Sequence, residues 1–384
     1  MKTFRTAALF AGIGGVELGL ADSGHEANLF CEFDGGAGAV LRHNFPDVPF
    51  HNDVRTLRKL PDDTTLLTAG FPCQDLSQAG GTRGIQGERS GLVGEVFRLL
   101  RNHEIPNVLL ENVPFMLQLD RGQAMRIIAA EFEKLGYRWA YRVVDSRAFG
   151  LPQRRQRVFF FASRESDPSQ LLFQDDAGPE PDRSAEGRAC GFYWTEGVRG
   201  LGWAIDAVPT LKGGSTIGIP SPPAIWFPDG RIAKPDLRDA ERLQGFPDGW
   251  TEPAESIAKA SLRWKLVGNA VSVNTAKWVG EAISRQPIPL SVLPLPFEET
   301  KSWPLAAFGS ADEGRFEVLV SMWPRWTERP PLEDFLRYEP EPLSHRAVSG
   351  FLERLQRGNL RYPPEFLAAL LAHRKRSRAA LETA

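Results

Sequence analysis

The sequence has few cysteines, and they form none of the patterns that mark metal or disulfide sites. Its 384 residues contain three, Cys31, Cys73 and Cys190, which lie far apart with no Cys-x-x-Cys pair or Cys/His cluster. A sparse, odd set argues against a disulfide framework and is typical of a reducing compartment. We therefore expect a cytoplasmic protein without a bound metal.

Long hydrophobic runs, a signal-peptide pattern, internal repeats and a charge excess are also missing. No apolar run approaches the roughly 18 residues of a membrane-spanning helix, so we expect no membrane role. The net charge of −2 does not by itself indicate nucleic acid, although a cationic cleft can hide within a neutral total. With 42% hydrophobic residues, the chain is long enough for a large core and two or three modules.

Short apolar runs alternate with helical stretches in the first part of the chain. The runs are 7–10, 28–31, 66–69 and 108–110, and the helical stretches include 92–102 and 123–135. This alternation predicts an α/β fold with a Rossmann-like, mostly parallel sheet and helices on both faces. Ligands bind such sheets at the carboxyl ends of the strands, so the residues that follow each run are candidates for function.

The character of the sequence changes near Ser163 and again near Gln286. The first change leads into a polar stretch punctuated by Gly and Pro, and the second into proline-rich connections followed by two helical segments. We therefore expect a first domain at 1–163, a small second module at 164–236, a return to the first domain at 237–286, and a partly helical C-terminal extension at 287–384.

A glycine-rich segment, Phe10 to Gly15, follows the first apolar run. Such a turn lets the backbone approach a ligand closely. The dinucleotide pattern GxGxxG is incomplete, because Glu17 stands in place of its third glycine. Glu32 lies twenty residues after Gly12, where a carboxylate can accept hydrogen bonds from a ribose diol. A nucleoside-type cofactor site and a purely structural turn both fit these residues.

Three further candidates follow later runs. Cys73 lies in the proline-bounded loop after 66–69, where either an exposed nucleophile or a buried apolar cysteine is compatible with the pattern. Glu111 directly follows 108–110, and partial burial there predicts a raised pKa suited to proton donation. A helix cap or a surface acid would also fit Glu111. The arginines before the apolar run 158–161 could face an anionic ligand, or they could be charges exposed to solvent beside a strand.

In their order along the chain, these segments resemble the motifs of the cytosine-C5 DNA methyltransferase family. The resemblance covers about 3–161 and 237–283. The matching segments are Leu9–Gly15, Gly70–Ser77, Glu111–Val113, Gln153–Arg157, Arg242–Pro247 and Gly268–Val271. It implies a class I methyltransferase fold in which 164–236 is the target-recognition module.

The resemblance implies transfer of a methyl group from S-adenosylmethionine to C5 of a cytosine flipped out of double-stranded DNA. Cys73 is expected to attack C6 of the base as a thiolate. Glu111 is expected to protonate N3, and Arg157, with Arg155 in second place, to hold the base O2. The glycine-hinged segment 80–84 is suited to closing over the DNA.

The same resemblance implies a cofactor pocket. Phe10 is expected to stack on the adenine, Glu32 to bind the ribose, and Asp53 to accept a hydrogen bond from the adenine amino group. The other residues implied for the pocket and its surroundings are Gly12, Gly14, Gly15, Phe33, Gln74, Asn269 and Val271. Ala8 departs from the family, which often has an acid just before its Leu-Phe-Ala-Gly motif.

Other activities are open alternatives. A tRNA cytosine-C5 methyltransferase of the same family would usually have a Cys-Phe-Thr tripeptide and a proline in place of Phe71, and this chain has neither. An inactive DNA-binding regulator would need to lack Cys73, Glu111 or Arg157. An NAD-dependent oxidoreductase would leave the cysteine loop unexplained. A restriction endonuclease acting on the same DNA sequence is a candidate partner, and we expect the protein to act as a monomer.

The extension at 287–384 exceeds what the family core requires, and the recognition module is short for the family. Phe351, Leu352 and Leu355 share one side of the first expected helix, which predicts packing on an apolar face of the catalytic domain. The arginines of the extension and its basic segment 373–378 favour a second interpretation, in which the extension contacts DNA. A protein partner is the third alternative.

Overall fold

The computed structural model describes residues 2–72, 91–180, 184–214, 222–297 and 302–382. The chain forms two compact units, each built from several separate segments. Unit 1 contains residues 1–149, 156–180 and 271–326, and unit 2 contains residues 150–155, 181–270 and 327–384. These units divide the chain differently from the boundaries that the sequence suggests, because packing brings together segments whose composition differs.

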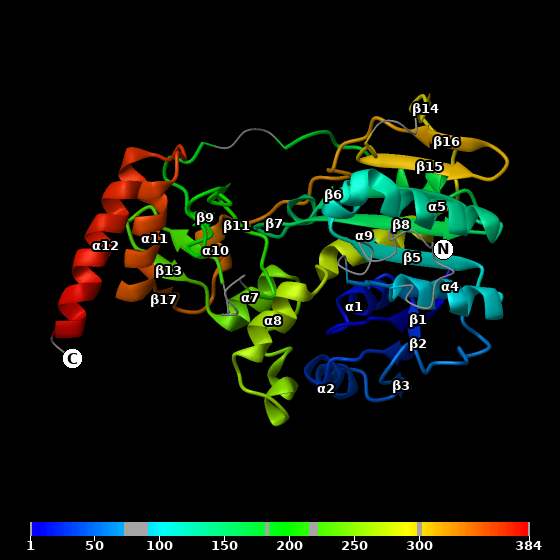
Figure 1. Ribbon diagram of the computed structural model, residues 1–384, viewed down its shortest axis with the longest axis horizontal. Helices are drawn as coiled ribbons and strands as arrows, with labels where there is room; N and C mark the ends of the chain where they lie inside the picture. The colour runs from blue at the N-terminus through cyan, green and yellow to red at the C-terminus, as the bar shows by residue number, and fades with distance from the viewer. Residues whose placement is uncertain (1, 73–90, 181–183, 215–221, 298–301, 383–384) are drawn as a thin grey trace. The chain divides into compact units, whose positions relative to one another are not determined.

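A ten-stranded sheet forms the centre of unit 1 (Figure 1). In spatial order its strands are β14 (Leu295–Pro296), β16 (Gly314–Glu317), β15 (Ala306–Ser310), β6 (Arg138–Asp145), β8 (Gln156–Ser163), β5 (Asn107–Asn112), β4 (Leu66–Ala69), β1 (Arg5–Leu9), β2 (Glu26–Cys31) and β3 (Phe50–His51). Strands β3, β2, β1, β4 and β5 are mutually parallel, whereas the remaining strands pair antiparallel. The four apolar runs expected to be strands coincide with β1, β2, β4 and β5, except that Phe10 lies just beyond the end of β1.

Helices cover both faces of this sheet, which confirms the predicted fold class. The helices of unit 1 are α1 (Gly15–Ala21), α2 (Gly35–Asn44), α4 (Val93–Asn102), α5 (Gln123–Lys134), α6 (Ser169–Leu172) and α9 (Val273–Ile283). Phe97 of α4 and Phe132 of α5 are buried in one hydrophobic cluster. Leu20 of α1 and Trp278 of α9 are buried in another. The run in β8 is apolar throughout because Phe160 belongs to the first cluster and Phe159 to the second.

Unit 2 is built around a smaller antiparallel sheet. Its strands, in spatial order, are β10 (Ala204–Ile205), β9 (Cys190–Phe192), β12 (Ala224–Trp226), β13 (Ile232–Lys234) and β17 (Glu341–Pro342). A separate parallel pair joins β7 (Gln153–Arg154) to β11 (Val208–Pro209). The helices are α7 (Leu237–Leu243), α8 (Leu262–Asn269), α10 (Leu332–Phe335), α11 (His345–Arg357) and α12 (Pro364–Glu382).

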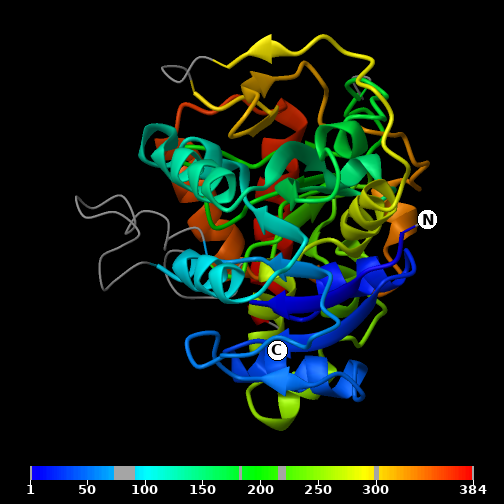
Figure 2. The ribbon, with the colours of Figure 1, turned by 90° about the vertical axis from the view of Figure 1, so that its right-hand side faces the viewer.

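The C-terminal extension is shared between the two units. Strands β14 to β16 continue the large sheet beyond β6, at the opposite end from β3 (Figure 2). In unit 2, β17 pairs with β13, and α11 and α12 lie side by side. Phe351, Leu352 and Leu355 are buried together with Phe192 of β9 and Phe366 of α12. The expected apolar face is therefore confirmed, but it packs within unit 2 and not on the catalytic sheet.

Among the described residues, no helix is long and apolar enough to span a membrane. The same residues contain no group of three or more His, Cys, Asp or Glu side chains arranged to hold a metal ion.

Candidate active site

The glycine-rich turn connects β1 to α1 at the carboxyl end of the central strand. Phe10 has a φ of 54°, Gly12 of 58° and Gly14 of 82°, so the backbone passes repeatedly through left-handed conformations. A Cβ atom on Gly14 would lie 2.9 Å from the ring of Phe45. A left-handed phenylalanine is uncommon, and such strain concentrates at ligand sites. The turn is therefore a rigid, closely packed feature at the edge where ligands bind.

Glu32 follows β2 and fixes this turn. Its Oε2 accepts a hydrogen bond of 2.8 Å from the amide of Gly12, and its Oε1 accepts one of 2.7 Å from the amide of Asp34. Burial raises the pKa of the Glu32 carboxyl. Each carboxylate oxygen can accept a second hydrogen bond, so the group can shape the turn and still accept from a diol.

Asp53, Arg55 and Phe33 form a group near the end of β3. Arg55 Nη2 lies 2.7 Å from Asp53 Oδ2, and its guanidinium carbon lies 5.4 Å from the centre of the Phe33 ring. Hydrogen bonds from Arg55 lower the pKa of the Asp53 carboxyl. Phe33 is 74% exposed, so its ring presents an apolar face. Arg55 was not singled out from the sequence, because an arginine two residues after an aspartate carries no distinguishing signal.

Glu111 and Arg157 form a buried ion pair. Glu111 is the penultimate residue of β5, and Phe159 lies opposite it on β8. Arg157 comes two residues before Phe159 and therefore shares the same face. Its Nε lies 2.8 Å from Glu111 Oε1, and both side chains are about nine-tenths buried. The burial of Glu111 could be expected from the sequence, whereas its contact with Arg157 could not.

The base of the loop leading to Cys73 is held against this pair. Asn112 Nδ2 donates a hydrogen bond of 3.0 Å to the carbonyl of Phe71. The Cβ position of Gly70 lies 3.4 Å from Glu111 Oε2, so the end of the strand is in van der Waals contact with the carboxylate. Cys73, Gln74 and the segment 80–84 lie outside the described residues.

The other two cysteines have a different character. Cys31 and Cys190 are buried free thiols. Burial raises the pKa of Cys31 to about 12 and that of Cys190 to about 11. A thiol of this kind is a poor nucleophile, because the thiolate is the reactive form.

Arg155 is separated from Arg157 by one residue, yet it belongs to unit 2. Its Nη1 donates to the carbonyl of Leu211 at 2.9 Å, and its Nη2 donates to the carbonyls of Gly268 and Ala270. The guanidinium is almost completely buried. In the described structure, Arg155 therefore holds the backbone on both sides of Asn269.

Gln153 begins the same motif and is fully buried in unit 2. Its side-chain amide donates to the carbonyl of Leu243 at 2.8 Å and to the side chain of Gln244 at 3.1 Å. Gln244 in turn donates to the carbonyls of Val267 at 2.8 Å and Ala270 at 3.4 Å. Three of the sequence motifs are thus connected by hydrogen bonds within one unit, a relation that their order in the chain does not indicate.

Asn269 and Val271 lie on either side of the boundary between the units. Asn269 ends α8 in unit 2, where Gly213 packs directly on its side chain. Val271 is buried in unit 1 just before α9. Ser272 precedes this helix, and its hydroxyl lies 2.9 Å from that of Ser146.

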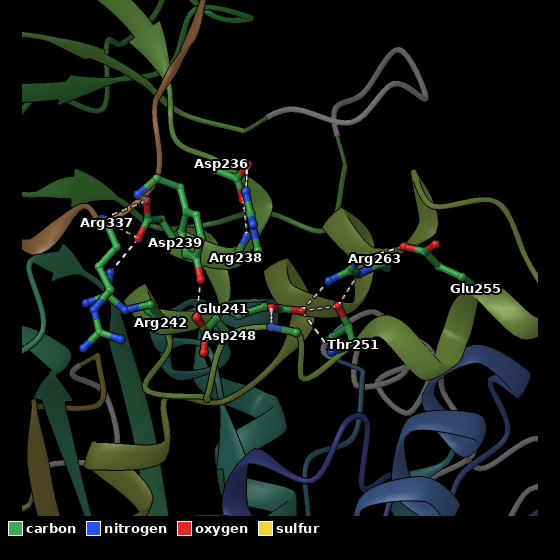
Figure 3. Close-up of polar contacts among 12 residues, drawn as sticks. Asp236, Arg238, Asp239, Glu241, Arg242, Asp248, Thr251, Glu255, Arg263 and Arg337 are labelled. Atoms are coloured by element: carbon green, nitrogen blue, oxygen red, sulfur yellow. Dashed lines mark hydrogen bonds and ion pairs between the residues drawn. The ribbon is translucent and has the colours of Figure 1, made fainter.

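Helix α7 carries two carboxylates that are fully enclosed in unit 2 (Figure 3). Asp239 accepts from the amides of Arg337 and Tyr338, each at 3.0 Å, and therefore binds the extension. Glu241 accepts from the amide of Thr251 at 2.9 Å and pairs with Arg263 of α8 at 3.1 Å. This helix joins the extension to the segment that leads toward Asn269.

One buried side chain near the glycine-rich turn was noted in the sequence only as a replaced glycine. Glu17 of α1 is 4% exposed. Its Oε1 accepts a hydrogen bond of 2.9 Å from Thr68 of β4, and burial raises the pKa of its carboxyl to about 7. A polar residue inside a helix that is otherwise apolar toward the sheet was the available signal.

The sheet of unit 1 and the residues at its strand ends define a class I methyltransferase fold. The structure of the Dnmt2 methyltransferase from S. pombe is similar to it, with a TM-score of 0.53 and 17% identity over 73% of this chain and 97% of that one. The methyltransferase EhMeth from Entamoeba histolytica also has a TM-score of 0.53, at 13% identity over 74% of this chain and 98% of that one.

Sequence comparison gives the family. The model of the C-5 cytosine-specific DNA methylase family matches residues 4–188. The type II methyltransferase M2.BsuMI of Bacillus subtilis is 48% identical over 95% of this chain and 97% of its own length. The type II methyltransferase M.Bsp6I of a Bacillus species is 34% identical over 72% of this chain and 97% of its own. The chain belongs to this family and is a DNA (cytosine-5-)-methyltransferase of the type II modification kind.

Proposed function

We propose that the protein transfers a methyl group from S-adenosylmethionine to C5 of a flipped-out cytosine in double-stranded DNA, with Cys73 as covalent nucleophile. The observation that carries this proposal is the buried Glu111–Arg157 pair at the base of the Cys73 loop. An acid beside a guanidinium can serve two neighbouring atoms of a pyrimidine, since N3 accepts a proton and O2 accepts hydrogen bonds. Cys31 and Cys190 are buried thiols with raised pKa values and are therefore poor nucleophiles, which supports Cys73 in this role.

The turn between β1 and α1 fits the proposed cofactor. Gly12 leaves its side-chain space open, with no atom within 4 Å of the Cβ position, and Glu32 has remaining acceptor capacity beside it. Phe33 offers an exposed ring for the adenine, and Asp53 a carboxylate near that ring. We also propose that Phe10, Gly14, Gly15, Gln74, Asn269 and Val271 take part, as the family motifs imply. Bound S-adenosylmethionine supplies an electrophilic methyl group.

The protein residues make C5 able to accept that group. The Cys73 thiolate forms a bond to C6, and the electron pair displaced through the ring is stabilised when Glu111 protonates N3. Arg157 holds O2 and stabilises negative charge that develops there. After methylation, a water molecule accepts the C5 proton, the electron pair of that C–H bond restores the C5–C6 double bond, and the Cys73 sulfur leaves as a thiolate. N3 returns its proton to Glu111, which regenerates the acid.

Arg155 has a positioning part in this proposal. Its contacts with the carbonyls of Gly268 and Ala270 order the backbone around Asn269. The buried guanidinium is therefore proposed to act through that segment. Unit 2 is proposed to contain the target-recognition surface, and a type II restriction endonuclease of the same sequence specificity is the proposed partner. We also propose that one copy of the chain acts alone on DNA.

The first experiment tests the covalent step. Bisulfite mapping of DNA from cells expressing the protein identifies the methylated sequence. A duplex with 5-fluorocytosine at that position should then form a stable adduct, because fluorine cannot leave as a cation. Cys73→Ser should form no adduct and transfer no methyl group, whereas Cys190→Ala should behave as wild type. Normal turnover by Cys73→Ser would exclude the mechanism, and methylation of tRNA alone would support the tRNA alternative.

A second experiment tests the acid. Glu111→Gln keeps the shape of the side chain but cannot donate the same proton, so the rate of methyl transfer should fall by about 100-fold or more. The affinity for S-adenosylmethionine should change little. A variant with the wild-type rate and weak cofactor binding would instead place Glu111 in the cofactor pocket.

A further inference from the structure

The carboxyl of Glu17 is buried and only half used by the protein. Thr68 donates to Oε1, whereas Oε2 has no hydrogen-bond partner among the described residues. An unsatisfied buried oxygen is costly, and native structures retain few of them. This oxygen therefore calls for an explanation beyond packing.

The position of Glu17 places it beneath the proposed reaction site. Thr68 comes two residues before Gly70 on the same strand, so both lie on one face of the sheet. Gly70 faces Glu111 Oε2 on that face and also lies 3.9 Å, measured from its Cβ position, from the carbonyl of Phe10. Glu17 thus lies on the face that carries the proposed acid, close to the glycine-rich turn. Figure 1 shows α1 beside β1.

We propose that Glu17 senses the charge of the cofactor: it is ionised when the positively charged methyl donor is bound and protonated when the uncharged thioether product is bound. This inference rests on the proposed use of S-adenosylmethionine. The donor and the product differ by one positive charge on sulfur. In a poorly hydrated site, that charge stabilises a nearby carboxylate far more than it would in water.

Burial makes the carboxyl responsive near neutral pH. Burial, together with the charge of Glu32, raises the pKa of Glu17 to about 7. A small stabilisation of the anion is then enough to ionise the group. The titratable or charged groups on the surrounding elements are Glu32 after β2, Glu111 of β5 with Arg157 of β8, and Lys277 and Glu281 of α9.

The consequence is that the protein binds the methyl donor more tightly than the product. Once the methyl group has left, the ionised carboxylate loses its cationic neighbour and takes up a proton, which removes the contact that held the donor. One unit of pKa shift corresponds to about tenfold in relative affinity. Glu17→Gln should therefore lower the ratio of donor affinity to product affinity by roughly tenfold at pH 8.

Titration calorimetry in two buffers of different ionisation enthalpy tests this inference without turnover. At pH 7, wild-type protein should release more protons on binding S-adenosylmethionine than on binding S-adenosylhomocysteine, after subtraction of the same difference for Glu17→Gln. The subtraction removes proton changes of the ligands' own amino groups. Asp22→Asn, which removes an exposed carboxylate from the end of the same helix, should keep the wild-type difference.

Thr68→Val provides a second variant, because loss of its hydrogen bond destabilises the Glu17 anion. The excess proton release should then reach its maximum at higher pH. Equal proton release with both ligands in wild type and Glu17→Gln would overturn the charge-sensing inference and leave the proposed function intact. Failure of wild type to bind either ligand would overturn both.

Discussion

The buried carboxylates of the two units differ in how completely the protein uses their oxygens. In unit 2, Asp239 and Glu241 accept from backbone amides and pair with arginines, so each is enclosed by partners (Figure 3). In unit 1, Glu17 keeps an oxygen without a hydrogen bond among the described residues. A buried carboxylate whose oxygens all have partners within the protein stabilises the fold. A buried carboxylate that keeps a free acceptor oxygen beside a strand end can interact with a ligand there.

The largest expected effect would come from breaking the saturated network. Glu241→Gln leaves Arg263 and the amide of Thr251 without their anionic acceptor, and we expect the free energy of unfolding to fall by about 3–5 kcal/mol. Urea denaturation followed by circular dichroism measures it. Glu255→Gln is the matched control, because Glu255 pairs with the same arginine but is 44% exposed; its loss should stay below about 1 kcal/mol. Equal losses would show that enclosure does not distinguish the two acids.

A smaller effect should come from the unsaturated acid. The pKa of Glu17 rises from 4.5 to about 7 on folding, so the folded protein binds more protons than the unfolded chain between these values. The free energy of unfolding should therefore fall as pH rises from about 4.5 to about 7, by at most about 3 kcal/mol. Glu17→Gln removes this decline and should be more stable than wild type above pH 7.

Thermal unfolding at several pH values checks the sign of this prediction. Asp22→Asn should retain the wild-type pH dependence. If Glu17→Gln were less stable than wild type at pH 8, the carboxylate would be a structural anchor like Glu241.

The smallest effect concerns the exposed group beside Phe33. Arg55→Ala removes the hydrogen bonds that lower the pKa of Asp53, so that pKa should rise toward its ordinary value. Carbon NMR of the Asp53 carboxyl measures the change. The melting temperature should not move, because water screens exposed ion pairs. A clear loss of stability would place this exposed group with the network on α7.

The parallel core could be predicted from the sequence because local and global signals agree there. Each apolar run in β1, β2, β4 and β5 is bounded by turn residues, and the candidate side chains follow these strands directly. The pairing of Glu111 with Arg157 was not predicted, because it depends on the antiparallel register of β5 and β8. That register joins residues 46 positions apart, and no local pattern encodes it.

The two arginines of the Gln153–Arg157 motif show the same limit. Sequence alone treats Arg155 and Arg157 as similar cations before a strand. In the structure, Arg155 belongs to unit 2 and binds backbone carbonyls, whereas Arg157 belongs to unit 1 and pairs with Glu111. The extension shows it again: composition marks residues 287–384 as one segment, but the pairing partners of β15 and β17 divide it between two sheets.

This division also has a consequence for the order of events during synthesis. Unit 1 requires α9 and β15, and unit 2 requires α11 and α12, which come more than 100 residues after β12 in the chain. Until then, the apolar side chains of β9 and β12 have no cover from Phe351 or Phe366. Domains usually fold as they emerge, N-terminal first, and exposed apolar surface favours aggregation. We therefore expect unit 2 to remain incomplete until α12 has been synthesised, so the yield of the protein should depend on slow synthesis or chaperones.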